Sequence, residues 1–256
     1  MDARSTLCYV ASMRFRPDPA TSAAASSILR QLRTERDITS RAHAIAQGLQ
    51  GHPYVANALV GGASQAEQLV VDLAGFDCVT FVENVLALAR SSSVNGYVDQ
   101  LVALRYLRGR IGWRQRNHYF HDWLQRNAAL DAIHVDTDGP GSRVVKARLA
   151  SIDGLPARAV QFAAVTPRNL LRAAPRIAHG SVAAFVSSRP RQLDFCHTGL
   201  LFWEPITGVT AERLMLYHAT RSLGGVVAEP INRFFQRVRT RGVVFARILP
   251  PAGAST

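Results

Sequence analysis

Residues 75–90 read Gly75-Phe76-Asp77-Cys78-Val79-Thr80-Phe81-Val82-Glu83-Asn84-Val85-Leu86-Ala87-Leu88-Ala89-Arg90, so a cysteine stands where a strongly apolar helix should begin. Gly75 ends whatever precedes it, Asp77 is a good N-cap residue, and no Gly or Pro interrupts the residues that follow. Cys78 should therefore lie in the first helical turn, where N–H groups and the helix dipole stabilise a thiolate. On this stretch alone, Cys78 is either a nucleophile or a small buried residue.

The same stretch also predicts which way the thiol points. Successive side chains of a helix are about 100° apart, so Cys78 shares a face with Val82, Val85 and Ala89. This face is apolar and should pack against the rest of the protein. Glu83 falls on the opposite stripe, which favours a structural role for this carboxylate over a catalytic one.

Length and composition indicate one ordinary globular domain, or one domain with an added lobe. The chain has 256 residues, of which 48% are hydrophobic, enough for a sizeable core. Residues 1–25 are small and polar and are predicted to be a poorly ordered lead-in, with one domain over residues 26–256. The net charge of +12 comes almost wholly from scattered arginines. This scatter argues against a nucleic-acid module and suits an anionic substrate or an anionic surface.

The cysteine count excludes two classes of small domain. Cys8, Cys78 and Cys196 are odd in number and irregularly spaced, so neither a disulfide framework nor a CxxC zinc knuckle is expected. No apolar run approaches the roughly 18 residues of a membrane span. The N-terminal residues carry no credible export signal. The sequence predicts no cofactor and leads to no prediction of oligomeric state.

Predicted helices precede predicted strands along the chain. This order indicates an α+β fold in which a buried helix with the nucleophile at its N-terminus packs on an antiparallel sheet. Helices are expected over residues 24–47, with a new start at 37, and over 98–108 and 166–173. Strands are expected at 69–73, as two segments within 133–152 joined at 138–141, and at 182–187, 195–203, 213–219 and 243–248.

Two histidines lie in neighbouring predicted strands. If the strands form a hairpin whose ends meet at Trp203 and Glu212, His197 lies directly opposite His218, on the same face of the sheet. A slip of one residue would put the two rings on opposite faces. Cys196 alternates to the other face from His197 and is expected to be buried and inert.

Together these residues match the needs of nucleophilic acyl transfer. Cys78 would attack a carbonyl carbon, His197 would take and return the proton, and His218 would orient His197. The N–H groups of the first helical turn, above all that of Cys78, and the hydroxyl of Tyr54 could stabilise the oxyanion. Alternatively, both histidines are satisfied sheet residues and Tyr54 is a core ring. Zinc held by Cys78, His197 and His218 is the least favoured reading.

A second unusual segment is dense in aromatic and polar side chains. It contains Trp113, Arg114, Arg116, Asn117, His118, Tyr119, Phe120, His121, Asp122 and Trp123. The segment is either part of a binding surface or a helix with an aromatic inner face and a solvated basic outer face.

The chain resembles the N-acetylmuramoyl-L-alanine amidase-like branch of the NlpC-like cysteine peptidase superfamily of cell-wall hydrolases. The resemblance runs from about Ile38 to Ile248. Its motifs are Gly51-His52-Pro53-Tyr54, Phe76-Asp77-Cys78-Val79-Thr80-Phe81-Val82-Glu83, Arg105-Tyr106 with Gly109, Arg116-Asn117-His118-Tyr119 with Trp123, His197-Thr198-Gly199 and His218-Ala219. Two positions depart from the family pattern, Gly180-Ser181 before a core strand and Cys196 before the catalytic histidine.

The resemblance implies a papain-like catalytic domain over residues 26–256, with Cys78 as nucleophile, His197 as base and His218 as orienting residue. The implied reaction is hydrolysis of the N-acetylmuramoyl-L-alanine amide in peptidoglycan fragments, with anhydro-muropeptides favoured and no metal required. Arg116, Asn117, His118 and Tyr119 would line the substrate cleft, with Arg116 available to a peptide carboxylate.

Three functions stay open at this point. The first is the thiol amidase, whose partner is a peptidoglycan-derived muropeptide. The second is an endopeptidase that cuts within the stem peptide, and the third is an inactive basic protein that binds the wall. The resemblance implies a periplasmic or otherwise extracytoplasmic location, in tension with the missing export signal.

Overall fold

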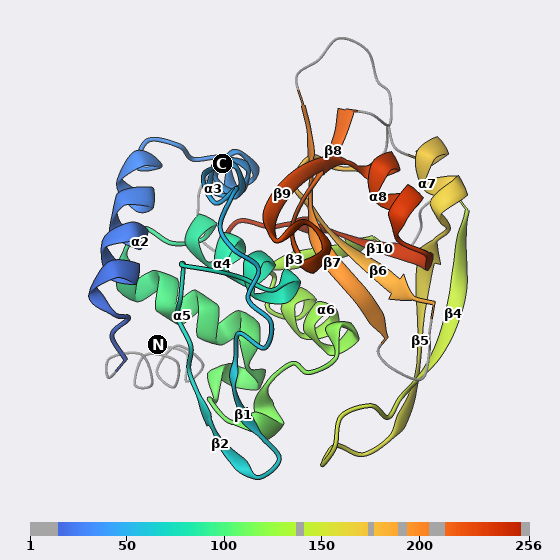
Figure 1. Cartoon of the computed structure of the whole chain (residues 1–256), viewed down its shortest axis with the longest axis horizontal. Helices are drawn as coiled ribbons and strands as arrows, with labels where there is room; N and C mark the ends of the chain where they lie inside the picture. Colours follow the sequence, from blue (N-terminus) through green and yellow to red (C-terminus); the bar gives the residue numbers. More distant parts are fainter. Residues whose placement is uncertain (1–14, 137–140, 174–176, 189–193, 205–212, 252–256) are drawn as a thin grey trace. The chain divides into compact units, whose positions relative to one another are not determined.

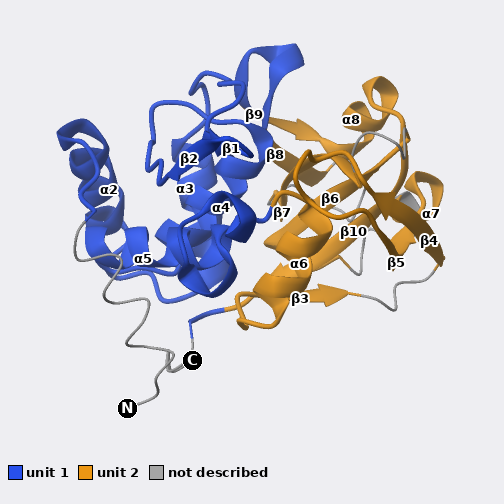
Figure 2. Ribbon diagram, turned by 90° about the horizontal axis from the view of Figure 1, so that it is seen from below, with its two compact units in different colours: residues 1–117, 219–226, 250–256 blue, residues 118–218, 227–249 orange. Residues whose placement is uncertain are grey.

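The structure is a computed structural model, which describes residues 15–136, 141–173, 177–188, 194–204 and 213–251 (Figure 1). The chain divides into two compact units, coloured separately in Figure 2. Unit 1 comprises residues 1–117, 219–226 and 250–256, and unit 2 comprises residues 118–218 and 227–249. Cys8, residues 138–140 and Glu212, all named in the sequence predictions, lie outside the described residues.

Unit 1 is mainly helical. Helix α4 contacts α3 and α5, and α2 contacts α5. Its elements are α2 (Pro19–Gln31), α3 (Ile38–Gly48), β1 (Val60–Gly62), β2 (Gln65–Gln68), α4 (Cys78–Ala89), α5 (Val94–Arg105) and the 3₁₀ turns η1 (Leu107–Gly109) and η2 (Trp113–Gln115). The short strand predicted at residues 69–73 is wrong, because strand β2 ends at Gln68.

Helix α2 corrects the predicted lead-in. The Asp18 carboxylate caps the helix by accepting the N–H groups of Ala20 at 2.9 Å and Thr21 at 3.0 Å. Pro19 occupies the first helical position, where its missing N–H costs nothing and its fixed φ suits the helix. The Asp-Pro pair is thus a helix start, and residues 19–25 are ordered as helix.

Helix α4 begins at Cys78, as predicted, and is buried on all sides. Asp77 and Thr80 form a capping box at its start. Every residue from Thr80 to Ala89 is buried, including the polar Glu83 and Asn84. The expected contrast between two faces is therefore absent, and polar groups on α4 need partners inside the protein.

Unit 2 is built on a sheet with short helices. Its elements are α6 (Phe120–Ala128), β3 (Ile133–Asp136), β4 (Ser142–Leu149), β5 (Arg158–Val165), α7 (Pro167–Ala173), β6 (Ser181–Ser187), β7 (Phe195–Trp203), α8 (Ile231–Arg237) and β10 (Thr240–Ile248). Strands β8 (Leu214–Thr220) and β9 (Gly225–Pro230) have residues in both units. Its core contains Leu170, Phe185, Leu201, Leu216, Phe234 and Val243.

Among the described residues, eight strands form one sheet in the order β4-β5-β10-β6-β7-β8-β9, with β3 also pairing with β10. The pairs from β3 to β8 and β10 are antiparallel, which confirms the α+β prediction. The two strands predicted within 133–152 exist, but β3 pairs with β10 and β4 with β5. No helix of the described ranges is both long and apolar enough to cross a membrane.

Candidate active site

The predicted nucleophile, Cys78, is partly buried at the first position of α4 in unit 1. The Asp77 carboxylate accepts the N–H groups of Val79 at 3.0 Å and Thr80 at 2.7 Å. The N–H groups of Val79 and Thr80 are thus engaged by the cap, which weakens their proposed role as oxyanion donors.

Tyr54, the second predicted oxyanion donor, is held beside this helix start. Its N–H donates to the carbonyl of Gly224 at 2.9 Å, and its backbone forms a parallel bridge with Phe76. Burial, followed by the charges of Cys78 and Asp77, raises the pKa of Tyr54, while Arg221 acts to lower it. The phenol therefore stays protonated at neutral pH and can donate a hydrogen bond close to Cys78.

The two predicted histidines meet in unit 2, but in a different register from the predicted one. Leu200 pairs with Tyr217, and Trp203 pairs with Leu214. One step further along, His218 lies opposite Gly199 and diagonal to His197. The predicted direct opposition is therefore wrong by two residues, and because two is a full period of a strand, both rings still share a face.

Gly199 explains how the diagonal pair can come together. A Cβ at this position would lie 2.7 Å from the carbonyl oxygen of Tyr217 and 2.9 Å from Cβ of His218. Both distances are shorter than real Cβ contacts. The missing side chain leaves room for strand β8 and the ring of His218 beside strand β7.

We expect Gly199→Ala to disturb the histidine pair. The added methyl group must push back the backbone of Tyr217 and the start of the His218 side chain, which costs about 1–3 kcal/mol in a packed core. Chemical denaturation should show the loss of stability, and the imidazole NMR signals of His197 and His218 should shift. Unchanged stability together with unchanged imidazole signals would show that the strands have room for a Cβ.

The two rings form a hydrogen-bonded pair. Nε2 of His197 lies 2.6 Å from Nδ1 of His218, which is fully buried. Phe234 stacks on the His197 ring with centroids 5.4 Å apart and planes at 24°. The pairing engages Nε2 of His197, so a proton transferred to this ring would have to go to the other nitrogen, Nδ1.

His197 is held neutral. Burial, then the nearby His218 and Arg237, lowers the pKa of His197 from 6.5 to about 3. Removing a cation from water is costly, and Arg237 adds like-charge repulsion. At neutral pH the imidazole is therefore uncharged and has a lone pair on one ring nitrogen.

This lowered pKa predicts an acid-dependent loss of stability. Between the unfolded pKa of 6.5 and the folded pKa of about 3, the unfolded chain binds the extra proton, so stability falls as pH decreases through this window. From pH 7 to pH 4 the loss due to His197 should be on the order of 3 kcal/mol. Urea unfolding of the wild type and His197→Gln measures it, because the variant should lose less. An equal loss of unfolding free energy between pH 7 and pH 4 in the wild type and in His197→Gln would contradict the prediction.

Sequence reasoning missed two residues that extend this pair. Nε2 of His218 lies 3.0 Å from Oε1 of Glu229, and Arg237 donates from Nη2 to the same oxygen. Glu229 lies on β9, next to β8 in the sheet. The signal for this strand was the turn at Gly224, whose φ of +77° suits glycine, followed by the β-branched pair Val226-Val227.

Residues 116–119, which were predicted to line the substrate cleft, make hydrogen bonds to other parts of the protein. In unit 1, Nη1 of Arg116 pairs with Oε1 of Glu67 at 3.1 Å, and the Asn117 side chain donates to the carbonyl of Leu104 at 2.9 Å. Arg116 thus already has a carboxylate partner, which weakens its proposed role in binding a peptide carboxylate.

His118 and Tyr119 open unit 2. His118 is partly buried, whereas Tyr119 is 2% exposed. The Tyr119 hydroxyl accepts the N–H groups of Ser151 at 2.8 Å and Ile152 at 3.0 Å. This placement favours an anchoring role for Tyr119 over contact with substrate.

Cys196 is exposed, so the prediction that it is buried was wrong. The β6–β7 pairing shifts register here, from Phe185 opposite His197 to Val186 opposite Phe195, so Cys196 is an extra residue in the strand and regular alternation does not apply to it. Its thiol lies 3.5 Å from the carbonyl oxygen of Phe185, and local desolvation raises its pKa. A raised pKa keeps it as the less reactive thiol form.

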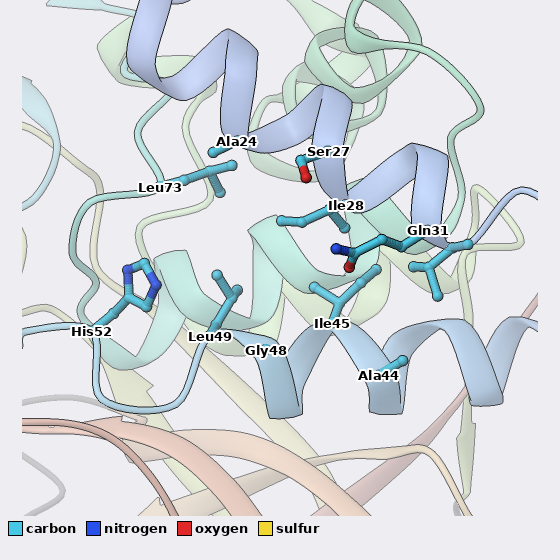
Figure 3. A pocket seen from close by; sticks show the side chains of 11 residues that line it. Ala24, Ser27, Ile28, Gln31, Ala44, Ile45, Gly48, Leu49, His52 and Leu73 are labelled. Atoms are coloured by element: carbon cyan, nitrogen blue, oxygen red, sulfur yellow. The ribbon is translucent and has the colours of Figure 1, made fainter.

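A separate cavity in unit 1 contains none of the predicted catalytic residues. It has a volume of about 320 Å³ and is lined mainly by small and apolar side chains of α2 and α3, with His52 and Leu73 at one end (Figure 3). It offers no nucleophile beside a base. Within the described ranges, no group of three or more His, Cys, Asp or Glu side chains is arranged to hold a metal ion.

Known structures share this fold. A protein from Legionella pneumophila superposes with a TM-score of 0.78 at 18% identity, over 91% of this chain and 96% of the other. An N-acetylmuramoyl-L-alanine amidase from Bacteroides uniformis gives a TM-score of 0.71 at 21% identity, over 82% and 98%. A candidate xylanase from Bacteroides fragilis gives 0.65 at 23%, over 80% and 100%. At such identities the likeness establishes the fold alone.

The family assignment comes from the sequence. No curated protein matches the chain. A family model described as N-acetylmuramoyl-L-alanine amidase-like matches residues 44–243, which include Tyr54, Cys78, His197 and His218. The chain therefore belongs to the N-acetylmuramoyl-L-alanine amidase-like family.

Proposed function

We propose that the protein is a thiol-dependent amidase that hydrolyses the bond between the lactyl group of N-acetylmuramic acid and L-alanine in peptidoglycan fragments, with anhydro-muropeptides as favoured substrates. The observation that carries the proposal is the His197–His218 pair at 2.6 Å, with His218 buried, in a chain of the amidase-like family that also begins a buried helix with Cys78. In this proposal Cys78 is the nucleophile, His197 the base and His218 the residue that orients His197.

In the first half of the reaction, Sγ of Cys78 attacks the carbonyl carbon of the lactyl amide while its proton passes to Nδ1 of His197. The tetrahedral intermediate then collapses. The C–N bond breaks, the nitrogen of L-alanine takes the proton from His197, and the peptide leaves with a free amino group. The lactyl carbonyl remains as a thioester on Cys78.

In the second half, water attacks the thioester and gives a proton to His197. The C–S bond breaks, the lactyl carboxylate is released, and the proton returns to the sulfur. The negative oxygen that forms in each half would accept hydrogen bonds from the N–H of Cys78 and the hydroxyl of Tyr54. The raised pKa of Tyr54 supports this role, because a phenol must keep its proton to donate.

The resting site would hold a neutral imidazole on His197. The pKa of about 3 for His197 argues against a permanent thiolate–imidazolium pair. Once the proton moves, thiolate and imidazolium stabilise each other as opposite charges. The charge pair would thus form only as the substrate is attacked.

We further propose that the fold is papain-like, within the NlpC-like superfamily, and that the protein acts outside the cytoplasm, where peptidoglycan lies. The net charge of +12 suits substrates that carry peptide carboxylates.

The identity of the products tests the proposal. The wild type is incubated with anhydro-N-acetylmuramoyl tetrapeptide, and the products are identified by their masses in mass spectrometry. An amidase releases the intact tetrapeptide, with L-alanine at its amino end, and anhydro-N-acetylmuramic acid. The same experiment with the reducing muropeptide measures the preference for the anhydro sugar.

The two alternatives give different results. An endopeptidase leaves L-alanine on the sugar and releases a shorter peptide. An inactive wall-binding protein leaves the muropeptide intact but sediments with purified peptidoglycan sacculi. Either result would overturn the proposed amidase function.

A further inference from the structure

The hydrogen-bonded chain in unit 2 continues beyond the two histidines. We propose that Glu229, held in place by Arg237, is a positioning residue that sets the tautomers of His218 and His197 so that Nδ1 of His197 is the proton acceptor. The inference rests on the proposed function, because that function makes His197 the base. It adds to the reaction two residues, Glu229 and Arg237, that would touch no substrate.

The geometry is a continuous chain of contacts. Nε2 of His197 lies 2.6 Å from Nδ1 of His218, and Nε2 of His218 lies 3.0 Å from Oε1 of Glu229. Arg237 donates to the same carboxylate oxygen. The His218 side chain is fully buried and that of Glu229 is 11% exposed, so water has little access to compete for these bonds.

Of the three residues His197, His218 and Glu229, only Glu229 has a fixed role in its hydrogen bonds. Burial acts to raise its pKa, but hydrogen bonds from His218 and Arg237 and the charge of Arg237 lower it overall. An ionised carboxylate only accepts hydrogen bonds. The contact with His218 therefore requires a proton on Nε2 of that ring.

The rest of the chain follows when each ring carries one proton. With its proton on Nε2, His218 has a lone pair on Nδ1, so the 2.6 Å contact needs a proton on Nε2 of His197. Nδ1 of His197 is then left with a lone pair. The opposite order would put a proton on Nδ1 of His197 and block it as a base, which makes the direction of the chain decisive for catalysis.

Arg237 provides a second constraint on the direction of hydrogen-bond donation, which runs from His197 to His218 to Glu229. A guanidinium only donates, so it fixes an oxygen at the Oε1 position. In Glu229→Gln, Arg237 should keep the amide oxygen there, and His218 should still find an acceptor. In the double variant Glu229→Gln/Arg237→Met, the amide can flip and donate from its NH₂ group to His218, which reverses the chain.

The experiment compares these variants in the full-length chain by two measurements. The first assigns the protonated nitrogen of each ring by ¹H–¹⁵N NMR of histidine-labelled protein. The second measures kcat and KM with anhydro-N-acetylmuramoyl tetrapeptide. Glu204→Gln is the matched control, because the Glu204 carboxylate accepts from the Tyr217 hydroxyl at 2.7 Å and has no role in the chain. Thermal unfolding confirms that each variant is folded.

The wild type, Glu204→Gln and Glu229→Gln should carry the proton of His197 on Nε2. Glu229→Ala should give mixed tautomers and the double variant the reversed ones. In both, kcat should fall by about 10- to 100-fold while KM changes less than about twofold. If Glu229 only stabilised the fold, the tautomer of His197 would not change from one variant to the next in this way.

Two results would overturn the proposal. One is a wild-type-like His197 tautomer in folded Glu229→Ala, and the other is a changed tautomer with unchanged kcat. If the wild type fails to cleave the muropeptide, the proposed function fails on its own, and the spectra still decide whether Glu229 sets the tautomers.

Discussion

Cys78→Ala is expected to reduce amide hydrolysis by about 10⁴-fold or more, because removing a nucleophile leaves only the contribution of binding and oxyanion stabilisation. The fold should persist. The side chain is small and only partly buried, and the helix start depends on Asp77 and Thr80 and not on the sulfur. Rates of peptide release from anhydro-N-acetylmuramoyl tetrapeptide measure the effect, and far-UV circular dichroism checks the helices.

The matched control is Cys196→Ala, which removes the second described thiol and should leave the rate unchanged. Iodoacetamide near neutral pH offers an independent measurement, since the wild type should be alkylated first at Cys78. Cys196 is exposed, yet its raised pKa leaves few thiolates to react. Full activity in Cys78→Ala would remove the nucleophile from the proposal, and equal or faster labelling of Cys8 or Cys196 would count against a tuned thiol.

The start of α4 and the histidine strands could be predicted because their signals are local. An Asp cap before an unbroken apolar run predicts a helix start within one turn, and α4 begins at Cys78. β-branched and aromatic runs predicted strand β7 with the observed bounds, Phe195–Trp203. Asp18-Pro19 carries an equally local signal, a capping carboxylate before a proline at the first helical position, and the prediction of a lead-in over residues 1–25 overlooked it.

The register of the histidine pair could not be predicted, because it depends on the connection between two strands. The predicted opposition of His197 and His218 assumed a hairpin closing at Trp203 and Glu212, whereas Trp203 pairs with Leu214. The two rings still lie on the same face of the sheet because the predicted register was wrong by two residues, and side chains two residues apart on a strand point to the same face. The contact itself depends on the absence of a side chain at Gly199, which only tertiary packing reveals.

The partners of polar residues were the hardest part of the site to predict. Glu229 lies 11 residues from His218, across a turn, and nothing in its own surroundings marks it as a histidine partner. The segment from Arg116 to Tyr119 shows the reverse error. Its unusual composition predicted a binding surface, yet Arg116 pairs with Glu67 and the Tyr119 hydroxyl with backbone N–H groups. Composition identified polar residues there but not what they contact.

Arg105→Met is expected to destabilise unit 1 by about 3–5 kcal/mol, because it leaves a buried carboxylate without its cation. Nε of Arg105 lies 2.7 Å from Oε2 of Glu83, and both side chains are only 2% exposed. Nη1 of Arg105 also donates to the carbonyl of Val70 at 2.6 Å, so the same guanidinium links α4, α5 and the segment before Cys78. Urea unfolding at neutral pH measures the loss.

The double variant Glu83→Leu/Arg105→Met separates the loss of the ion pair itself from the cost of burying a carboxylate without its cation. Removing both charges ends the desolvation cost, so it should recover most of the stability lost in Arg105→Met. Arg247→Met is the control on an exposed pair, since Arg247 and Asp136 are 48% and 36% exposed, and it should cost less than about 1 kcal/mol. A loss in Arg105→Met no larger than in Arg247→Met would mean that Glu83 is stable without its cation. The buried ion pair would then not be what holds the helix of Cys78 against α5.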